Sequence, residues 1–342
     1  MNIESPVFPK LSGLRKARML RQHDLVRTAH ITDCDLPILV EPNIEDLDLL
    51  SWAGSNRPFI EQLLRRHGGV LFRNFRISGV EEFQRFVTTV SAEPLEYKEQ
   101  TSPRTKVHGN IYTSTEYPPE QSIFLHNENS YSSIWPLKIM FFCVTEPQTE
   151  GETPLADVRR VLARIPSRIR ERFEREGWML VRNFGTGYGL PWQTAFQTND
   201  PEEVTHHCAM AGISVEWLNA DRLRIRQSRP AIRNHPLTYE PVWFNHATFF
   251  HVSTLDPKIR HTLQSELKAE DLPYNTYYGN GTEIEPDVLD VLRDSYKQEI
   301  VKFAWRKTDL LLLDNMLVAH GRSPFRGPRK VVVGMSEPYS EN

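Results

Sequence analysis

The order of the predicted strands and helices constrains the fold of this chain more than any other feature. Short apolar runs typical of buried strands dominate the middle and the end of the sequence. They lie at 70–72, 123–125, 139–144, 178–183, 223–227, 242–245, 300–305, 310–313 and 330–335. Helical periodicity is found at 57–68, 80–90, 157–176 (interrupted by Pro166) and 287–296. Because strands do not alternate strictly with helices, a doubly wound parallel sheet is disfavoured. We predict a mainly β protein with helical decoration (α+β), of the double-sheet jelly-roll type.

Composition predicts an ordinary globular protein. The chain has 342 residues and no linker or repeat, so we expect a single domain, 1–342, with 1–55 as an N-terminal extension packed on the core. A net charge of −3 gives no electrostatic footprint for nucleic acid. The sequence has no apolar run long enough for a membrane span, and its start lacks the pattern of a secretory signal. The three cysteines are widely separated, which predicts a cytoplasmic protein without a disulfide framework.

A candidate metal site follows the run 123–125. His126 and Glu128 are two residues apart, and residues at this spacing on a strand point to the same face. His320, which also follows a long apolar run, is the best candidate for a third ligand. Two histidines and one carboxylate leave three positions of an octahedral Fe(II) open for a 2-oxo acid and dioxygen. Taken alone, His126 could equally be a hydrogen-bonded core histidine and Glu128 a surface residue.

Two further residue types suit the binding of a carboxylate. Thr153 lies in the polar turn 151–157, and Arg329 opens the last predicted strand, nine residues after His320 (329 − 320). The guanidinium fork of an arginine matches the geometry of a carboxylate. Arg322 is nearer to His320 and is the second choice. Each of these residues could also be an ordinary turn or surface residue, so the assignment depends on the metal motif.

Several motifs, found together and in order, resemble the TauD/TfdA (taurine dioxygenase) superfamily. More narrowly, the chain looks like the SyrP-like branch, whose members tailor amino acids in natural-product pathways. The resemblance extends from about residue 60 to 337. It rests on the runs IYTSTEYP (111–118), HNENSYS (126–132), VWFNH (242–246), YYGNG (277–281), LDNMLVAHGR (313–322) and FRGPR (325–329).

This resemblance implies a distorted double-stranded β-helix of the clavaminate synthase type. It implies Fe(II) held by His126, Glu128 and His320, 2-oxoglutarate held by Thr153 and Arg329, and dioxygen as the oxidant. The implied reaction is hydroxylation of an unactivated C–H bond of an amino acid, free or tethered to a carrier protein, in specialised-metabolite (antibiotic) biosynthesis. Most members have aspartate where this chain has Glu128. Related halogenases have a small residue there, so a carboxylate argues against halogenation.

The substrate contacts and the reaction outcome remain open at this level. Tyr112, Thr115, Asn129 and His246 are candidate substrate residues because they lie in or beside the motifs, but packing roles fit them equally well. Desaturation or cyclisation could use the same cofactors, and an oligomer is compatible with the sequence. A zinc hydrolase could use the same three ligands, although it would need no Thr–Arg pair for a 2-oxo acid. A binding protein without catalysis is the remaining alternative.

Overall fold

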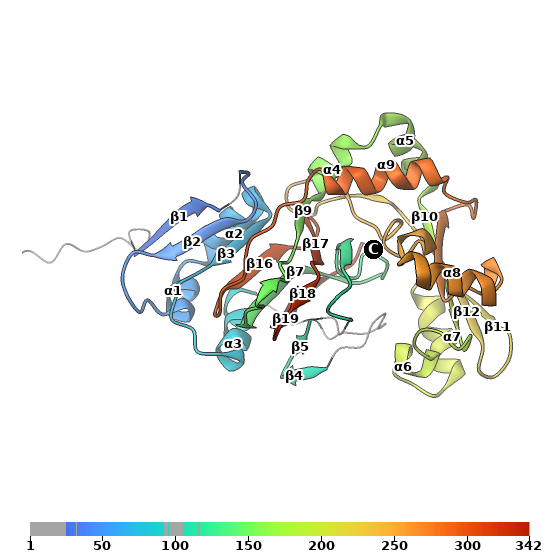
Figure 1. Ribbon diagram of the computed structural model, residues 1–342, viewed down its shortest axis with the longest axis horizontal. Helices are drawn as coiled ribbons and strands as arrows, with labels where there is room; N and C mark the ends of the chain where they lie inside the picture. Colours follow the sequence, from blue (N-terminus) through green and yellow to red (C-terminus); the bar gives the residue numbers. More distant parts are fainter. Residues whose placement is uncertain (1–24, 32, 92–94, 96–104, 115–116, 342) are drawn as a thin grey trace, which may run out of the picture.

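A sheet of eight strands forms the centre of the molecule (Figure 1). The computed structural model describes residues 25–31, 33–91, 95, 105–114 and 117–341. The strand order is β1-β2-β3-β16-β7-β19-β5-β4, and neighbours are antiparallel except β2 and β3. The strands are β1 Val26–His30, β2 Ile38–Pro42, β3 Gly69–Phe72, β4 Lys106–His108, β5 Ile111–Thr113, β7 Trp135–Thr145, β16 Leu310–Asp314 and β19 Lys330–Tyr339. Strands β1 and β2 lie within the predicted extension 1–55, of which residues 1–24 are outside the described residues.

A smaller antiparallel sheet packs over the large one. It has the order β6-β17-β9, and a two-stranded ladder of β8 and β18 lies beside it. These strands are β6 Ile123–His126, β8 Thr149–Glu150, β9 Leu155–Asp157, β17 Val318–Arg322 and β18 Phe325–Arg326. The ring of Phe141 on β7 lies 5.1 Å from the ring of His320 on β17, so the two sheets face each other. This is the double-sheet jelly roll that the sequence predicts.

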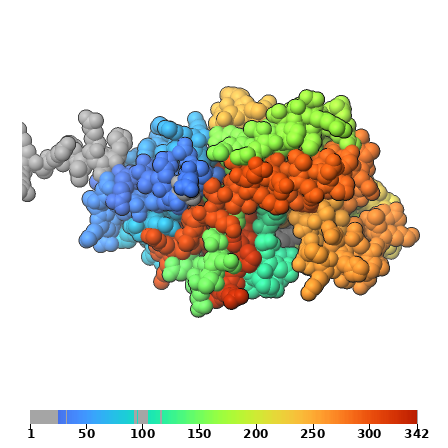
Figure 2. Space-filling view, turned by 45° about the horizontal axis from the view of Figure 1, so that its top comes forward, coloured from blue at the N-terminus to red at the C-terminus, as the bar shows by residue number. Residues whose placement is uncertain are grey.

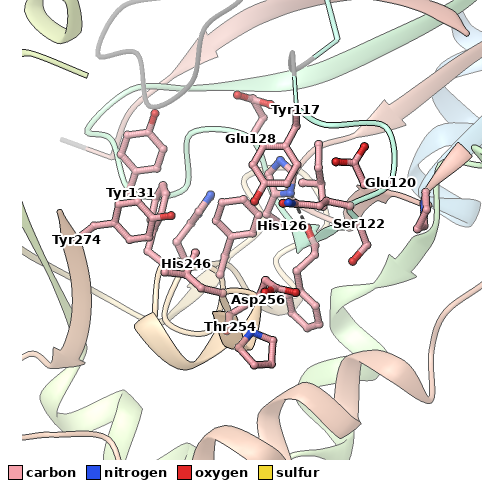
Figure 3. Close-up of a pocket in the computed structure, with 18 residues that line it drawn as sticks. Tyr117, Glu120, Ser122, His126, Glu128, Tyr131, His246, Thr254, Asp256 and Tyr274 are labelled. Atoms are coloured by element: carbon pink, nitrogen blue, oxygen red, sulfur yellow. Dashed lines mark hydrogen bonds between the residues drawn. The ribbon is translucent and has the colours of Figure 1, made fainter. Parts of the chain in front are cut away.

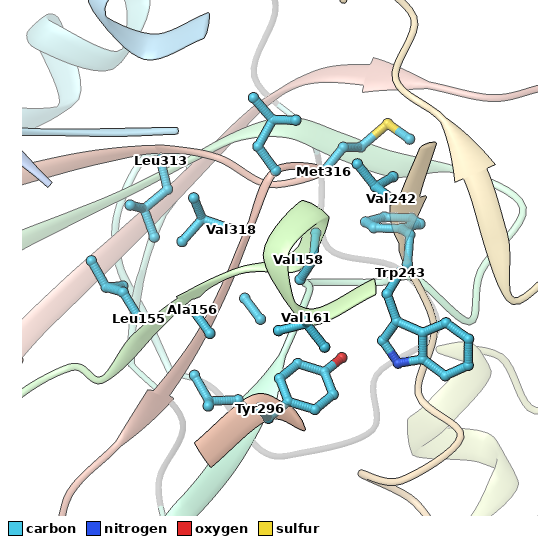
Figure 4. Packing of buried hydrophobic residues seen from close by; sticks show 14 of the residues in the cluster. Leu155, Ala156, Val158, Val161, Val242, Trp243, Tyr296, Leu313, Met316 and Val318 are labelled. Carbon is cyan, nitrogen blue, oxygen red and sulfur yellow. The ribbon is translucent and has the colours of Figure 1, made fainter. Parts of the chain in front are cut away.

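The leucines of β16 show why this strand lies at the centre. Side chains alternate between the two faces of a strand. Leu311 and Leu313 therefore enter the core between the sheets, whereas Leu310 and Leu312 face the opposite side, and all four are fully buried. Figure 4 shows Leu313 close to Val318 of the smaller sheet. Burial of each leucine contributes roughly 1.5–3 kcal/mol relative to an exposed one.

Three helices cover the outer face of the large sheet. They are α1 Leu49–Ser55, α2 Arg57–His67 and α3 Val80–Val90. Their apolar faces pack with Leu310 and Leu312 in one cluster. Helix α2 ends at Gly68, which has a φ of 72°, and a Cβ there would lie 2.5 Å from a side-chain carbon of Val318. The helix and its glycine cap are as predicted.

The remaining elements form insertions around the jelly roll. A four-stranded sheet of order β11-β12-β10-β15 contains β10 Trp178–Phe184, β11 Ser214–Trp217, β12 Leu223–Arg229 and β15 Tyr274–Tyr278, and a hairpin contains β13 Ile232–Asn234 and β14 Pro241–Trp243. The helices are α4 Val158–Arg164, α5 Ser167–Glu176, α6 Trp192–Phe196, α7 Pro201–Met210, α8 Pro257–Glu266 and α9 Pro286–Lys297, with short 3-10 helices η2 Val252–Thr254 and η3 Ala269–Asp271. Helix α9 contacts α4 and lies across the surface beside it (Figure 2). Pro166 separates α4 from α5, as predicted.

Some predicted elements differ from the structure. The strand expected at 300–305 is wrong, because only Val301 forms a β-bridge, to Leu155 of β9, and the segment is otherwise irregular. The short helices α6, α7 and α8 were not predicted, because each buries only one or two residues of its ten or fewer and so has a weak apolar pattern. Among the helices of the described residues, none is long and apolar enough to span a membrane.

Candidate metal centre

Two histidines face each other across neighbouring strands. His126 is the last residue of β6, and it pairs directly with His320, the middle residue of β17. Directly opposed residues project to the same side of a sheet, and the two ring centroids are 4.5 Å apart. A Cβ at Gly321 would lie 2.6 Å from the carbonyl oxygen of Ile123, so glycine is what allows β17 to approach β6 this closely.

Glu128 completes a three-residue cluster from outside the strands. The prediction that His126 and Glu128 share a strand face is wrong, because β6 ends at His126 and the chain turns through Asn129, which has a φ of 55°. The side chains converge all the same. One ligand atom from each of His126, Glu128 and His320 lies within 4.8 Å of the others. The carboxylate oxygen Oε2 of Glu128 is 3.8 Å from Nε2 of His320.

The turn that carries Glu128 is held by Asn315. The side-chain oxygen of Asn315 accepts a hydrogen bond from the Glu128 N–H at 2.8 Å. Its amide nitrogen donates to the carbonyls of Glu128 and Pro136, both at 2.9 Å. Asn127 lies between His126 and Glu128 and donates to the Asn315 carbonyl at 2.7 Å. Asn315 therefore connects the Glu128 turn to the turn between β16 and β17.

Asp314 fixes the second of these turns. One of its carboxylate oxygens accepts from the N–H groups of Met316 and Leu317 at 3.0 and 3.1 Å. The other lies 3.0 Å from Nε2 of the buried His235. Sequence reasoning did not assign a role to Asp314 or Asn315, although both lie in the motif 313–322. Together they set where β17 begins, and hence where His320 lies.

Hydrogen bonding orients the ring of His126. Its Nδ1 lies 2.9 Å from the carbonyl oxygen of Phe124. Because a carbonyl can only accept, Nδ1 carries the proton and Nε2 keeps its lone pair for a metal. The neighbouring His246 is buried, and this burial together with His126 holds its pKa well below the ordinary value, so His246 is neutral. The hydroxyl of Ser130 hydrogen-bonds to Nδ1 of His246.

The predicted carboxylate-binding residues lie on one side of the metal cluster. Thr153, Arg322 and Arg329 line the same small cleft as His126 and His320. The Thr153 hydroxyl oxygen accepts from Nε1 of Trp305 at 3.1 Å, which leaves its own proton available to donate.

The two arginines of this cleft differ in their partners. Within the described residues, Arg329 donates from Nε alone, to the Gly151 carbonyl at 2.8 Å. Burial lowers the pKa of Arg329 to about 10, so it remains charged at neutral pH. Arg322 uses both terminal nitrogens on the carbonyls of residues 117, 118 and 121. The terminal nitrogens of Arg329 have no such bonds to the part of the chain that the structure describes, so they are the better carboxylate donors.

These residues fit Fe(II) and 2-oxoglutarate. Two imidazole nitrogens and one carboxylate oxygen that converge on one position are the donors of a facial triad, which binds one face of an Fe(II) ion. A 2-oxo acid that chelates such a metal needs a donor for its far carboxylate. The partly buried cation of Arg329 and the hydroxyl of Thr153 supply donors in the adjoining cleft.

A larger cavity opens on the other side of the cluster (Figure 3). It has a volume of about 500 Å³ and reaches His126, Glu128 and His246. The Phe249 ring packs on that of His126, with centroids 4.5 Å apart. The residues that line the cavity also include Tyr117, Glu120, Phe250, Thr254, Asp256 and Tyr274.

The sequence candidates for substrate contact lie in different places. His246 lines the cavity. Tyr112, on β5, packs against the core, and Asn129 forms the turn after Glu128; neither is among the described residues that line the cavity. Thr115 lies outside the described residues. Tyr117 could have been found, because it belongs to the motif 111–118, but no sequence signal marks Glu120 or Asp256.

Comparisons with known proteins agree with this geometry. The family model "Taurine catabolism dioxygenase TauD, TfdA family" matches residues 32–335. The chain is 39% identical over 279 residues to the dapdiamide synthesis protein DdaC of Enterobacter agglomerans, covering 82% of this chain and 85% of that protein. It is 28% identical over 291 residues to a clavaminate synthase-like protein of Arabidopsis thaliana, covering 82% of this chain and 85% of that protein. The crystal structure of PvcB from Pseudomonas aeruginosa superposes with a TM-score of 0.57 at 17% identity, over 93% of this chain and 94% of that one, and so shares the fold.

Proposed function

Because the chain belongs to the TauD, TfdA dioxygenase family, we propose that it hydroxylates an unactivated C–H bond of an amino-acid-type substrate. The class of chemistry is that of a non-haem iron dioxygenase that uses Fe(II), 2-oxoglutarate and dioxygen. The likeness to DdaC, a dapdiamide synthesis protein, supports a role in the biosynthesis of a specialised metabolite. PvcB is described as an oxygenase from an isonitrile synthetic pathway, which agrees with such a setting.

One observation carries this proposal: the cluster of His126, Glu128 and His320 lies between two spaces of different character. The small cleft offers the partly buried cation of Arg329 and the hydroxyl of Thr153, which suit the far carboxylate of 2-oxoglutarate. The larger cavity has aromatic walls, which suit an organic substrate. A zinc hydrolase would have no use for the pair of Thr153 and Arg329.

The residues of the chain have separate tasks in this proposal. His126, Glu128 and His320 would hold the iron, which when bound supplies the oxidative chemistry that couples decarboxylation of 2-oxoglutarate to oxygen insertion. Arg329 and Thr153 orient 2-oxoglutarate through its distal carboxylate. Phe249 and Phe250 exclude water beside the metal position and hold the substrate so that one C–H group faces it.

The proposal includes two finer points about the substrate and its setting. The amino acid is either free or presented on a carrier protein, and the cytoplasm, where disulfides are rare, suits a chain whose three cysteines form none. Desaturation or cyclisation is the alternative outcome, because the same residues would serve it.

The test is a coupled assay under air. Protein, Fe(II) and 2-oxoglutarate are incubated with free and carrier-tethered amino acids, and both succinate and product mass are followed. Hydroxylation adds one oxygen atom to the substrate, whereas desaturation removes two hydrogens. Absence of substrate-dependent succinate across the whole panel would contradict the amino-acid proposal.

A further inference from the structure

We propose, resting on the proposed function, that His235 is a positioning residue of the metal centre, which acts through Asp314 on the two ligands Glu128 and His320. His235 directly follows β13 in the β13–β14 hairpin, and it is only 1% exposed. It touches the metal centre through the turn between β16 and β17, where its ring meets Asp314.

The hydrogen bonds of His235 fix which ring nitrogen carries the proton. Nδ1 accepts from the N–H groups of Leu237 and Thr238 at 3.3 and 3.0 Å, so it holds a lone pair. The proton is therefore on Nε2, which lies 3.0 Å from Oδ2 of Asp314 and donates to it. One nitrogen of the ring thus closes the hairpin turn, and the other holds the carboxylate of Asp314.

The Asp314 carboxylate depends on this donor. Asp314 is 5% exposed, so its oxygens need donors from the protein. Oδ1 accepts from the N–H groups of Met316 and Leu317, whereas among the described residues His235 alone donates to Oδ2. Without His235, Oδ2 would be buried without a partner. Rotation of the carboxylate toward another donor would then take Oδ1 away from the turn.

The turn 314–317 controls two of the three candidate metal ligands. Asn315, within the turn, holds the backbone of Glu128 by hydrogen bonds of 2.8 and 2.9 Å. His320 lies two residues after the start of β17, which follows the turn directly. A displacement of the turn is therefore transmitted to Glu128 and His320, whereas His126 belongs to a different strand, β6.

The hairpin that carries His235 is itself attached beside β17. A backbone hydrogen bond of 2.9 Å from the N–H of His235 to the carbonyl of Glu240 closes its turn. The Glu240 side chain forms an ion pair of 3.1 Å with Arg159, which also pairs with Asp157 of β9. Because β9 is a neighbour of β17, the hairpin and the strand of His320 are attached to the same strand. His235 is thus a fixed support for Asp314.

The test separates the two ring nitrogens of His235 by substitution. His235→Gln places an amide nitrogen near the Nε2 position and keeps a donor to Asp314, whereas His235→Asn places an oxygen near the Nδ1 position and keeps the hairpin turn. Each full-length variant is titrated with Co(II), whose visible absorption depends on the arrangement of its ligands. We expect Co(II) affinity to fall about tenfold in His235→Asn, with an altered spectrum, and to stay within about twofold of the native value in His235→Gln.

Two further variants test the route and control for stability. Co(II) affinity should fall in Asp314→Ala, and adding His235→Asn should cause no further loss, because no Oδ2 remains to accept the bond. Asn183→Ala, which removes a buried amide from β10, should leave Co(II) affinity and spectrum unchanged. The proposal would be overturned by native affinity in both His235 variants, by a loss in His235→Gln as large as that in His235→Asn, by a further loss in the double variant, or by no Co(II) binding to the native protein.

Co(II) binding involves no turnover, so this inference and the proposed function can fail separately. Loss of Co(II) affinity in His235→Asn but not in His235→Gln, with no oxidation of any amino acid by the native Fe(II) protein, would support the positioning role and contradict the proposed function. Native Co(II) affinity in His235→Asn, with substrate-dependent succinate formed by the native Fe(II) protein, would overturn the positioning role and leave the proposed function intact.

Discussion

The side chain of Asn315 forms two hydrogen bonds with the backbone of Glu128, accepting from its N–H at 2.8 Å and donating to its carbonyl at 2.9 Å. The amide thus pairs with one peptide segment as a neighbouring strand would, at the point where β6 has ended. The position of the Glu128 carboxylate, the candidate metal ligand, is therefore set by a buried side chain 187 residues further along the chain.

Replacement of Asn315 should weaken both the fold and the metal site. Asn315→Ala leaves the Glu128 and Pro136 groups buried without partners, so we expect a loss of about 2–4 kcal/mol in the free energy of unfolding. We also expect metal affinity to fall about 10- to 100-fold, as for other residues that orient metal ligands. Denaturant unfolding and Zn(II) titration measure the two effects separately.

Asn183 offers a matched control for that variant. It is also a buried amide that donates to two carbonyls, those of residues 270 and 272, but it lies in β10 away from the metal cluster. Asn183→Ala should lower stability and leave metal affinity unchanged. Equal effects of the two variants on metal affinity would contradict a specific positioning role for Asn315.

Metal binding should stabilise the native protein. The three ligand atoms converge only in the folded chain, so a metal at 100 times its Kd adds about 2.7 kcal/mol to the free energy of unfolding. We expect Tm to rise by a few degrees on addition of Mn(II) and to return on addition of a chelator. The same rise in Tm in the double variant His126→Ala/His320→Ala would show that the metal binds elsewhere.

Arg329 and Arg322 should differ in what they control. Arg329→Ala removes the partly buried cation of the small cleft, so we expect 2-oxoglutarate affinity to fall about 10- to 100-fold, measured by calorimetry on the Zn(II) form. Arg322→Ala removes the anchor of residues 117–121 and should chiefly weaken substrate binding in the large cavity. If Arg322→Ala lost 2-oxoglutarate affinity and Arg329→Ala did not, Arg322 would be the residue that binds the carboxylate of 2-oxoglutarate.

Trp305 should act on 2-oxoglutarate through Thr153. The indole N–H occupies one lone pair of the Thr153 oxygen and directs its proton elsewhere. Thr153→Val should lower 2-oxoglutarate affinity about tenfold, whereas Thr153→Ser should retain most of it. Trp305→Phe should show a smaller loss, because the hydroxyl remains but is no longer oriented. A Trp305→Phe effect that persists in the Thr153→Val background would indicate a separate role for the indole.

The sequence was most informative where side-chain pattern determines structure. The continuous apolar run of β16 and the glycine cap of α2 follow from local chemistry, and the jelly roll follows from the order of strands. Residues 300–305 have an apolar strand-like composition but no neighbour along most of their length, and only tertiary packing shows this.

The three side chains predicted to hold a metal do converge in the structure, although partly for a different reason than strand spacing. Strand periodicity does not place Glu128, since a turn and the distant Asn315 do so. Glu120 and Asp256, which line the large cavity, could not have been identified from the sequence. They are 136 positions apart (256 − 120), lie on irregular segments, and reach the same cavity only in the folded chain.

The most direct test of the central claim compares the native protein with Glu128→Ala, with Glu174→Ala as a control for the loss of one carboxylate. Fe(II) affinity is measured without oxygen, and 2-oxoglutarate-dependent succinate formation is then measured under air. We predict that the native protein and the control bind one Fe(II) per chain and form succinate, whereas Glu128→Ala loses at least about 100-fold in Fe(II) affinity and forms no product-coupled succinate. Native Fe(II) affinity together with native succinate formation in Glu128→Ala would contradict the assignment of His126, Glu128 and His320 as the iron site.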